Sequence, residues 1–288
     1  MDTFAVIGGD RRAIGLTEAL ATDGFPVIAA GFAYAELPAC VTGCTQLSQA
    51  VAAADHILLP LPVSKDDETL YLPFARETKT LVTLFPLIRE GQTVFGGLVS
   101  PAVAAQAAEC GVQILDYFAE EELAVRNAVP TAEGALQIAM EELPITLADS
   151  RCLITGGGRI AKELVPRLVA LHAHVTLAAR RPEERAAAQN AGCQVCDIGR
   201  IADNDYDVVF NTVPAMLFPD TVLAAMHPQT LMIELASEPG GIDRKAAARR
   251  GIRVIVASGL PGRVAPKTAG RIIGDTVLSM LRKRGHDL

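Results

Sequence analysis

Short apolar runs alternate along the chain with alanine-rich stretches in which apolar residues recur at helical spacing. Apolar runs of this kind are typical of strands in a parallel sheet, because helices cover both faces of such a sheet. The alternation therefore predicts an α/β fold made of strand–helix–strand units. The expected strands are FAVIG, PVIAAG, HILLPL, TLVTLF, VQILDY, RCLIT, HVTLAA, YDVVFNT, TLMIEL and IRVIVA.

An internal repeat divides the chain into two similar parts. Residues 6–32 align without a gap on residues 154–180, and the turn glycines Gly8 and Gly9 fall on glycines of the second copy. Each copy has the pattern of a strand, a glycine turn, a helix and another strand. The repeat predicts two Rossmann-like parallel-sheet domains joined by linking helices, with a cleft between them.

The chain is expected to pass between these domains twice. We predict an N-terminal α/β domain over residues 1–129, completed by a C-terminal helix over residues 266–288. Residues 130–265 are expected to form a linking helix and the second Rossmann domain.

Residues typical of helix ends stand at both places where the chain is expected to pass between the domains. The linking helix is expected to start at Thr131 and to stop at Pro144, with Leu136, Met140 and Leu143 as its apolar stripe. The final helix is expected to open at Pro266, because proline suits the first helical turn. The buried face expected for this final helix is Ile272, Ile273, Val277, Met280 and Leu281.

The second copy of the repeat carries a dinucleotide-binding signal. Its turn, GGGRIA over residues 156–161, fits GxGxxG/A and stands between an expected strand and an expected helix. Glycine lets the backbone approach a pyrophosphate, and the helix N-terminus offers unpaired N–H groups. A tight turn that binds nothing is the alternative. The expected cofactor contacts here are Gly156, Gly158, Arg159 and Ile160.

The end of the next strand predicts which dinucleotide binds. NAD-binding domains place an acidic residue there, whereas this chain has Arg180 and Arg181, which favour the additional phosphate of NADP. In the first copy Asp10 replaces Gly158 and Phe32 replaces Arg180. A carboxylate at that position opposes a pyrophosphate, so we expect residues 130–265 to bind NADP and the first domain to form the substrate side.

Two later loops are expected to border the nicotinamide, because ligands of parallel sheets bind beyond the carboxyl ends of strands. Their expected contacts are Thr212, Val213, Pro214, Ala236 and Ser237. Lys267 stands at a helix N-terminus, where it is expected to hold a carboxylate, and Arg263 is a weaker candidate. For each of these residues the alternative to ligand binding is a structural position in a solvated loop or at a solvated helix end.

Composition excludes several function classes. A net charge of −7 argues against nucleic-acid binding, and no apolar run is long enough to span a bilayer. The start of the chain reads as a strand and not as a signal peptide, so a cytoplasmic protein is expected. The six cysteines are expected to be thiols, without a metal site. No histidine stands in a catalytic pattern, which favours hydride transfer to a cofactor over hydrolysis.

Six motifs in order resemble one family along nearly the whole chain. GGDRR, EELAVRNAVPTAEGA, GGGRIA, NTVPAM, ELASEPGGID and SGLPGRVAPKTAG are similar to the A subunit of dipicolinate synthase from spore-forming bacteria. The resemblance implies NADP-dependent oxidation of dihydrodipicolinate, or of 4-hydroxy-tetrahydrodipicolinate, to dipicolinate during sporulation. It also implies a branch of the lysine pathway, the mother-cell cytoplasm and, as partner, the flavoprotein-like B subunit of dipicolinate synthase.

The resemblance implies a small dicarboxylate substrate that needs cationic partners. Arg12, Arg263 and Lys267 are candidates for its carboxylates, and Asn127 for its ring. Lys267 and Glu133 are the candidate catalytic residues. Glu238 and Arg126 depart from the family pattern. These departures affect which residues are expected to contact the substrate more than they affect the assignment to the family.

Two other functions remain open from the sequence. The first alternative is an NADP-binding structural or regulatory subunit, with catalysis in the B subunit. The second is an NADP-dependent dehydrogenase of a 2-hydroxy acid. The second normally requires a histidine paired with a carboxylate, and none stands out. A homo-oligomer is compatible with all of these functions.

Overall fold

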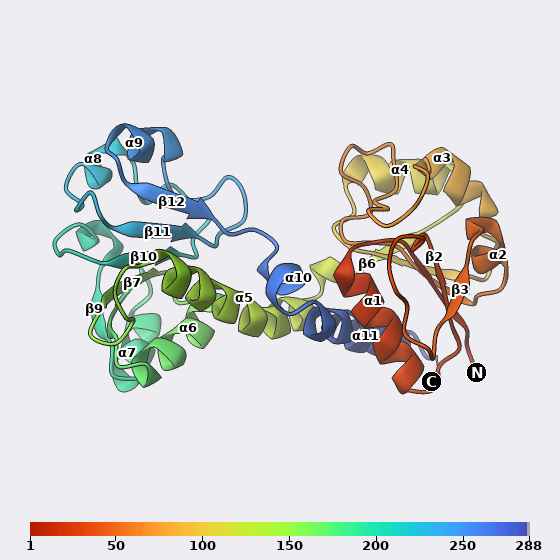
Figure 1. The fold of residues 1–288 in the computed structure, drawn as a ribbon, viewed down its shortest axis with the longest axis horizontal. Helices are drawn as coiled ribbons and strands as arrows, with labels where there is room; N and C mark the ends of the chain where they lie inside the picture. The colour runs from red at the N-terminus through yellow and green to blue at the C-terminus, as the bar shows by residue number, and fades with distance from the viewer. Residues whose placement is uncertain (287–288) are drawn as a thin grey trace. The chain divides into compact units, whose positions relative to one another are not determined.

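The computed structural model of the chain describes residues 1–286 and divides into two units. The first unit is formed by Met1–Asn127 together with the chain from Ala265 onwards, and the second by Ala128–Val264. Each unit contains one parallel six-stranded sheet (Figure 1). The predicted fold class, with two Rossmann-like sheets, is confirmed.

The sheet of the first unit has the strand order β3-β2-β1-β4-β5-β6. Helices α1 and α11 pack on one of its faces, and α2, α3 and α4 on the other. The strands are β1 (Phe4–Ile7), β2 (Val27–Ala30), β3 (Thr42–Cys44), β4 (His56–Leu58), β5 (Thr93–Gly96) and β6 (Ile114–Asp116). The helices are α1 (Arg11–Thr22), α2 (Leu47–Ala52), α3 (Leu81–Leu84), α4 (Pro101–Glu109) and α11 (Pro266–Lys283).

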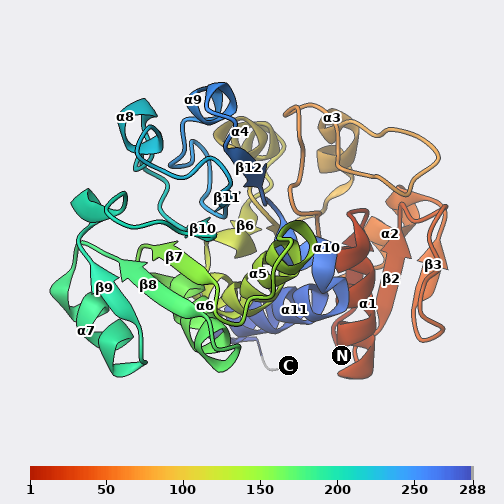
Figure 2. The same ribbon diagram turned by 60° about the vertical axis from the view of Figure 1, so that its left-hand side comes forward.

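The sheet of the second unit has the order β12-β11-β10-β7-β8-β9, which is the same connectivity as in the first. Helices α6 and α7 cover one face, and α8 and α9 the other (Figure 2). The strands are β7 (Arg151–Thr155), β8 (His174–Ala178), β9 (Gln194–Cys196), β10 (Val208–Asn211), β11 (Leu231–Glu234) and β12 (Arg253–Val256). The helices are α6 (Arg159–Ala170), α7 (Pro182–Asn190), α8 (Asp220–Leu223), α9 (Arg244–Arg249) and α10 (Leu260–Val264).

Strand burial follows from the two covered faces. In β7, Cys152 and Ile154 belong to the core under α6, whereas Leu153 between them belongs to the core under α8 and α9. Successive side chains of a strand point to opposite faces, so both kinds of position must be apolar. This is why the strands read as continuous apolar runs in the sequence.

Helices α1 and α11 cross at small residues. A Cβ atom added at Gly15 would lie 2.8 Å from the Cα of Lys267, and one added at Gly270 would overlap the backbone of α1. The expected buried face of the final helix is confirmed, and the helix opens at Pro266. Gly270 in the KTAG motif is therefore a packing residue.

One expected strand, TLVTLF, is a helix instead. Leu81, Leu84 and Phe85 are buried while Val82 is 70% exposed, which is helical and not alternating burial. A short apolar run has no periodicity that separates these possibilities. The strand next to β4 is TVFG of β5, which was not among the expected strands.

The linking helix also starts earlier than expected. Helix α5 spans Glu121–Glu142 and contains Pro130. Glu121 and Glu122 stand in its first turn, where carboxylates interact favourably with the positive end of the helix dipole. Met140 is 54% exposed, so it is not part of the apolar stripe. The buried residues of its second half are Ala132, Ala135, Leu136, Ile138 and Ala139.

Candidate functional site

The glycine turn of the second unit joins β7 to α6. Gly156 has φ +84°, a left-handed conformation that favours glycine, and Gly158 is the N-cap of α6 without a side-chain cap. A Cβ atom at Gly156 would lie 2.8 Å from Val213 Cγ2 and 2.9 Å from Thr212 Oγ1. A Cβ atom at Gly158 would meet nothing within 4 Å. The turn therefore packs on the 212–213 loop and leaves the helix N-terminus open.

A buried polar row lies next to this turn. The strand register places Thr155 of β7 and Glu234 of β11 on either side of Asn211 of β10. Thr155 Oγ1 donates to Asn211 Oδ1 at 2.5 Å, and Asn211 Nδ2 donates to Glu234 Oε1 at 2.7 Å. All three residues are buried. Each ends its strand, so the row marks the carboxyl edge of the sheet.

The row holds the two loops that were expected to border the nicotinamide. Glu234 Oε2 accepts from Gly241 N at 2.8 Å and Oε1 accepts from Ala236 N at 3.2 Å. Asn211 Nδ2 donates to Val213 O at 3.1 Å. Because these partners are backbone atoms, the row determines where both loops run. The loops lie beyond the carboxyl ends of β10 and β11. The strand order reverses between β7 and β10, and ligands of open parallel sheets usually bind beside such a reversal.

The two arginines after β8 have different surroundings. Arg181 Nε donates to Glu184 Oε1 at 2.8 Å, and this bond raises the pKa of Arg181. The Arg180 guanidinium has no hydrogen-bond or ion-pair partner within residues 1–286 and is exposed. The Glu184 side chain lies against Gly157, where an added Cβ would come within 2.6 Å of it. It also lines a cavity of about 500 Å³ between α6 and α7.

The glycine turn of the first unit is filled by its own chain. A Cβ atom at Gly8 would overlap the Leu72 side chain, and Gly9 N donates to Tyr71 O at 3.1 Å. Asp10 is the N-cap of α1 and accepts from Arg12 N at 3.0 Å. The glycine turns of the two units follow the same backbone path, but the first is filled by the Leu72 side chain and the second has space beside Gly158.

The expected substrate residues of the first unit are already paired with carboxylates. Arg12 donates through Nε and Nη2 to Asp10 at 2.8–3.2 Å, and through Nη2 to Leu61 O at 2.6 Å. Lys267 Nζ lies 3.0 Å from Glu18 Oε2 and its side chain is 81% exposed. Both residues belong to the helix pair α1 and α11.

The remaining expected residues lie on the helices α5 and α10. Glu133 of α5 is 3.7 Å from Arg167 of α6, an ion pair that joins two helices. Asn127 is half-buried in α5, and Arg263 is exposed in α10. Thr155, Asn211, Glu234 and Glu184 were not predicted as site residues. The available signal was a polar residue at the end of three apolar strands, RCLIT, VVFN and LMIE.

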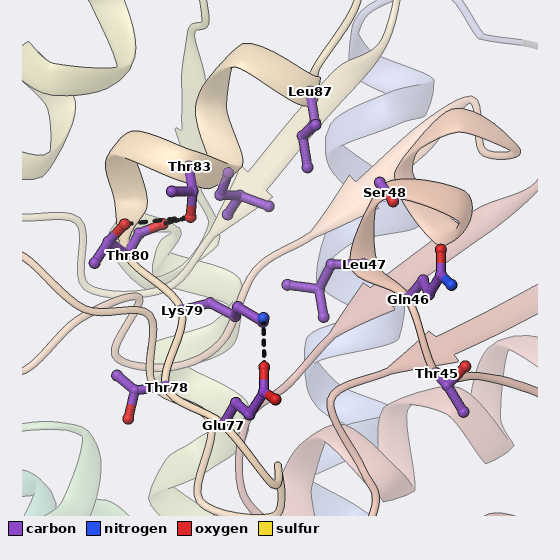
Figure 3. A pocket seen from close by; sticks show the side chains of 11 residues that line it. Thr45, Gln46, Leu47, Ser48, Glu77, Thr78, Lys79, Thr80, Thr83 and Leu87 are labelled. Carbon is purple, nitrogen blue, oxygen red and sulfur yellow. Dashed lines mark hydrogen bonds and ion pairs between the residues drawn. The ribbon is translucent and has the colours of Figure 1, made fainter.

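A cavity of about 640 Å³ is found in the first unit (Figure 3). It is lined by the segments 45–48 and 77–80 and by α3, and most of its polar groups are hydroxyls. Lys79 points to Glu77, with 2.8 Å between Nζ and Oε2 (Figure 3). This pairing lowers the pKa of Glu77. The lining contains no residue that the sequence pointed to as a site residue.

The cysteines are thiols, as expected. Burial raises the pKa of Cys193 and of Cys196, which argues against reactive thiolates in this CxxC pair. Within residues 1–286, no helix has the length and apolar character that crossing a membrane requires.

Comparison with known proteins identifies the family. Residues 3–118 match the family model of the N-terminal domain of the dipicolinate synthase A subunit. The chain is 30% identical over 285 residues to the dipicolinate synthase A subunit of Bacillus subtilis (strain 168), covering 96% of this chain and 95% of the relative. The chain belongs to the family of dipicolinate synthase A subunits.

Solved structures agree with this family. The dipicolinate synthase A subunit from Bacillus halodurans has a TM-score of 0.88 and 29% identity, with 97% of each chain covered. A transhydrogenase from Sinorhizobium meliloti has a TM-score of 0.75 and 16% identity, covering 97% of this chain and 94% of the other. The second likeness shows a shared fold. The sequence-based assignment to the dipicolinate synthase family is thus confirmed.

Proposed function

We propose that the chain oxidises dihydrodipicolinate, or its precursor 4-hydroxy-tetrahydrodipicolinate, to dipicolinate with NADP. The open glycine turn of the second unit carries this proposal, together with Arg180 after the next strand, which has no partner within residues 1–286. The precursor first loses water; the dihydropyridine then loses a hydride and a proton and becomes aromatic. When bound, NADP supplies the acceptor for that hydride.

The residues of the second unit fit a dinucleotide. Gly158 leaves space at the N-terminus of α6, and the first turn of a helix is where backbone N–H groups donate to phosphates, so we assign the pyrophosphate to Gly156, Gly158, Arg159 and Ile160. We assign the 2′-phosphate to Arg180, with Arg181 as a second donor. Residues 130–265 are in this proposal the NADP-binding domain.

The loops held by the buried row are assigned to the nicotinamide end. Thr212, Val213 and Pro214 follow β10, and Ala236 and Ser237 follow β11, so they border one edge of the sheet. A rigid backbone there orients a flat ring for transfer from one face. The nearby Gly156 contacts the same loop, which ties the pyrophosphate and nicotinamide ends together.

The substrate is a small dicarboxylate, and we assign it to the domain of residues 1–129 and 266–288. Its carboxylates would compete with Asp10 for Arg12 and with Glu18 for Lys267. Arg263 and Asn127 are further contacts, and Glu133 or Lys267 takes the ring proton. Because the product is aromatic, the oxidation is favourable and needs no strong base.

The family name implies a second kind of polypeptide in the enzyme. We propose that the chain acts with the flavoprotein-like B subunit of dipicolinate synthase in the mother-cell cytoplasm during sporulation, in a branch of the lysine pathway. A homo-oligomer is compatible with this arrangement.

The test uses the purified chain, NADP and enzymatically made dihydrodipicolinate. Growth of NADPH absorbance without the B subunit supports the proposal. Dipicolinate formed only when the B subunit is added, and without NADPH, would instead give this chain a binding role. NADPH formed from 2-hydroxy acids, but not from dihydrodipicolinate, would favour the dehydrogenase alternative.

A further inference from the structure

The geometry points to a divalent metal site formed by Asp2, His56 and His286 in the first unit. Each residue offers one ligand atom, and these three atoms lie within 4.8 Å of one another. From the sequence no metal was expected, because spacing along the chain gives no sign of this cluster. Two imidazoles and one carboxylate are a ligand set that zinc accepts, with water as the fourth ligand.

The distances require only a small movement. Asp2 Oδ2 and His56 Nε2 are 3.0 Å apart. Ligand atoms around tetrahedral zinc are separated by roughly 3.3 Å, as metal–ligand bonds of about 2.0–2.1 Å imply. This pair therefore already has a suitable separation. His286 stands edge-on to His56, with ring centroids 5.4 Å apart, and must approach by about one ångström or slightly more.

The second observation is the buried ring of His56. Its side chain is 3% exposed and packs on Phe4, with ring centroids 4.9 Å apart. Its Nδ1 is buried and has no hydrogen-bond partner in the described part of the chain. The ligand atom of His56 is Nε2, which faces Asp2, so Nδ1 on the opposite side of the ring is not a ligand. Packing of the buried ring fixes the direction of Nε2, and a ligand that is held in place favours a preformed metal site.

The position of the cluster indicates a structural role. Asp2 precedes β1, His56 is the first residue of β4, and His286 follows the C-cap region of α11. The cluster thus lies at the amino ends of the strands, opposite the carboxyl edge where parallel sheets bind substrates. A metal ion here would fasten the segment after α11 to the sheet.

Zinc titration by calorimetry tests the site directly. Cys40 and Cys110 are exposed thiols, and thiolates are zinc ligands, so they are first alkylated in every sample. We expect one zinc ion per chain with micromolar or tighter affinity, and a melting temperature raised by about 3 °C or more at saturation. His286→Ala and Asp2→Asn should each weaken binding about tenfold or more.

The matched control is His174→Ala. His174 lies 4.0 Å from Asp149 on the surface, and no third ligand joins this pair within the part of the chain that the structure describes. Its loss should leave zinc binding unchanged. No binding after alkylation, or affinity in the His286→Ala and Asp2→Asn variants equal to that of the unmodified sequence, would overturn the site. Co²⁺ absorption typical of tetrahedral nitrogen and oxygen ligands, lost in His286→Ala, is a second expected result.

Discussion

Arg180 and Arg181 differ in what surrounds their guanidinium groups. Arg181 is held by Glu184, whereas the Arg180 side chain has no hydrogen-bond or ion-pair partner among residues 1–286. A bound phosphate gains more from a guanidinium that no carboxylate already neutralises. At the scale of single residues, Arg180 is thus the better candidate for selecting NADP.

Replacement of Arg180 by glutamate should weaken NADP binding by about tenfold or more, since a charge-assisted hydrogen bond contributes about 1.5–3 kcal/mol. NAD has no 2′-phosphate, so its affinity should change much less. Fluorescence or calorimetric titration with both nucleotides measures the two effects. Unchanged NADP affinity in Arg180→Glu would remove this residue from the site.

Glu184 should oppose the cofactor. Its carboxylate lies against Gly157 and neutralises Arg181, so Glu184→Gln removes a like charge near the pyrophosphate and frees a cation. NADP binding should become about threefold to tenfold tighter. Glu183→Gln is the matched control, because Glu183 is 68% exposed and 3.7 Å from Arg181. Equal effects of both variants would indicate general charge and not this contact.

At the scale of elements, the buried row is the most sensitive part of the site. Asn211→Ala removes the acceptor of Thr155 and one donor of Glu234, which leaves buried polar groups without partners. The free energy of unfolding should fall by about 2–3 kcal/mol in urea titrations. Asn190→Ala, at the exposed end of α7, should change it little. Similar losses in both variants would contradict a special role for the row.

The crossing of α1 and α11 gives an equally local test. Gly270→Val places side-chain atoms in the backbone of α1 and should destabilise the protein by about 2–3 kcal/mol. Gly274→Ala is the control on the same helix, since its Cβ would lie 3.4 Å from Leu16 Cδ1, an ordinary contact. That variant should be neutral or slightly stabilising. Melting temperatures of the two variants separate these outcomes.

Elements were predictable where their signal is local. The glycine turn between β7 and α6 and the helix opened by Pro266 follow from neighbouring residues, so the sequence was sufficient to predict them. The prediction of a strand for TLVTLF was wrong, because six residues are too few to show whether the hydrophobic period is that of a strand or of a helix. The buried row could not be predicted, because Asn211 meets Thr155 and Glu234 only when β10 pairs with both β7 and β11. The pairing of Lys267 with Glu18 likewise depends on how α1 packs on α11.

At the scale of the whole molecule, one fold is present twice with different chemistry. Both sheets have the same strand order, and Gly8 N and Gly156 N each donate to the second strand at 2.8 Å. In the first unit, however, Ile7 stands where the second has Thr155, and Leu72 fills the turn. Only the second copy combines an open turn with a polar row, so a single cofactor per chain is expected.

Hydrogen exchange with and without NADP can distinguish the two copies within one molecule. Because bound phosphate accepts from backbone N–H groups, amides of residues 156–160 should exchange more slowly with NADP, as should those of Thr212 and Val213 in the loop assigned to the nicotinamide. The equivalent segment 8–12 should not change, which makes it an internal control for general stabilisation. Arg180→Glu at the same nucleotide concentration should abolish the protection. Protection confined to residues 8–12, or spread equally over both turns, would contradict the assignment of the cofactor to the second unit.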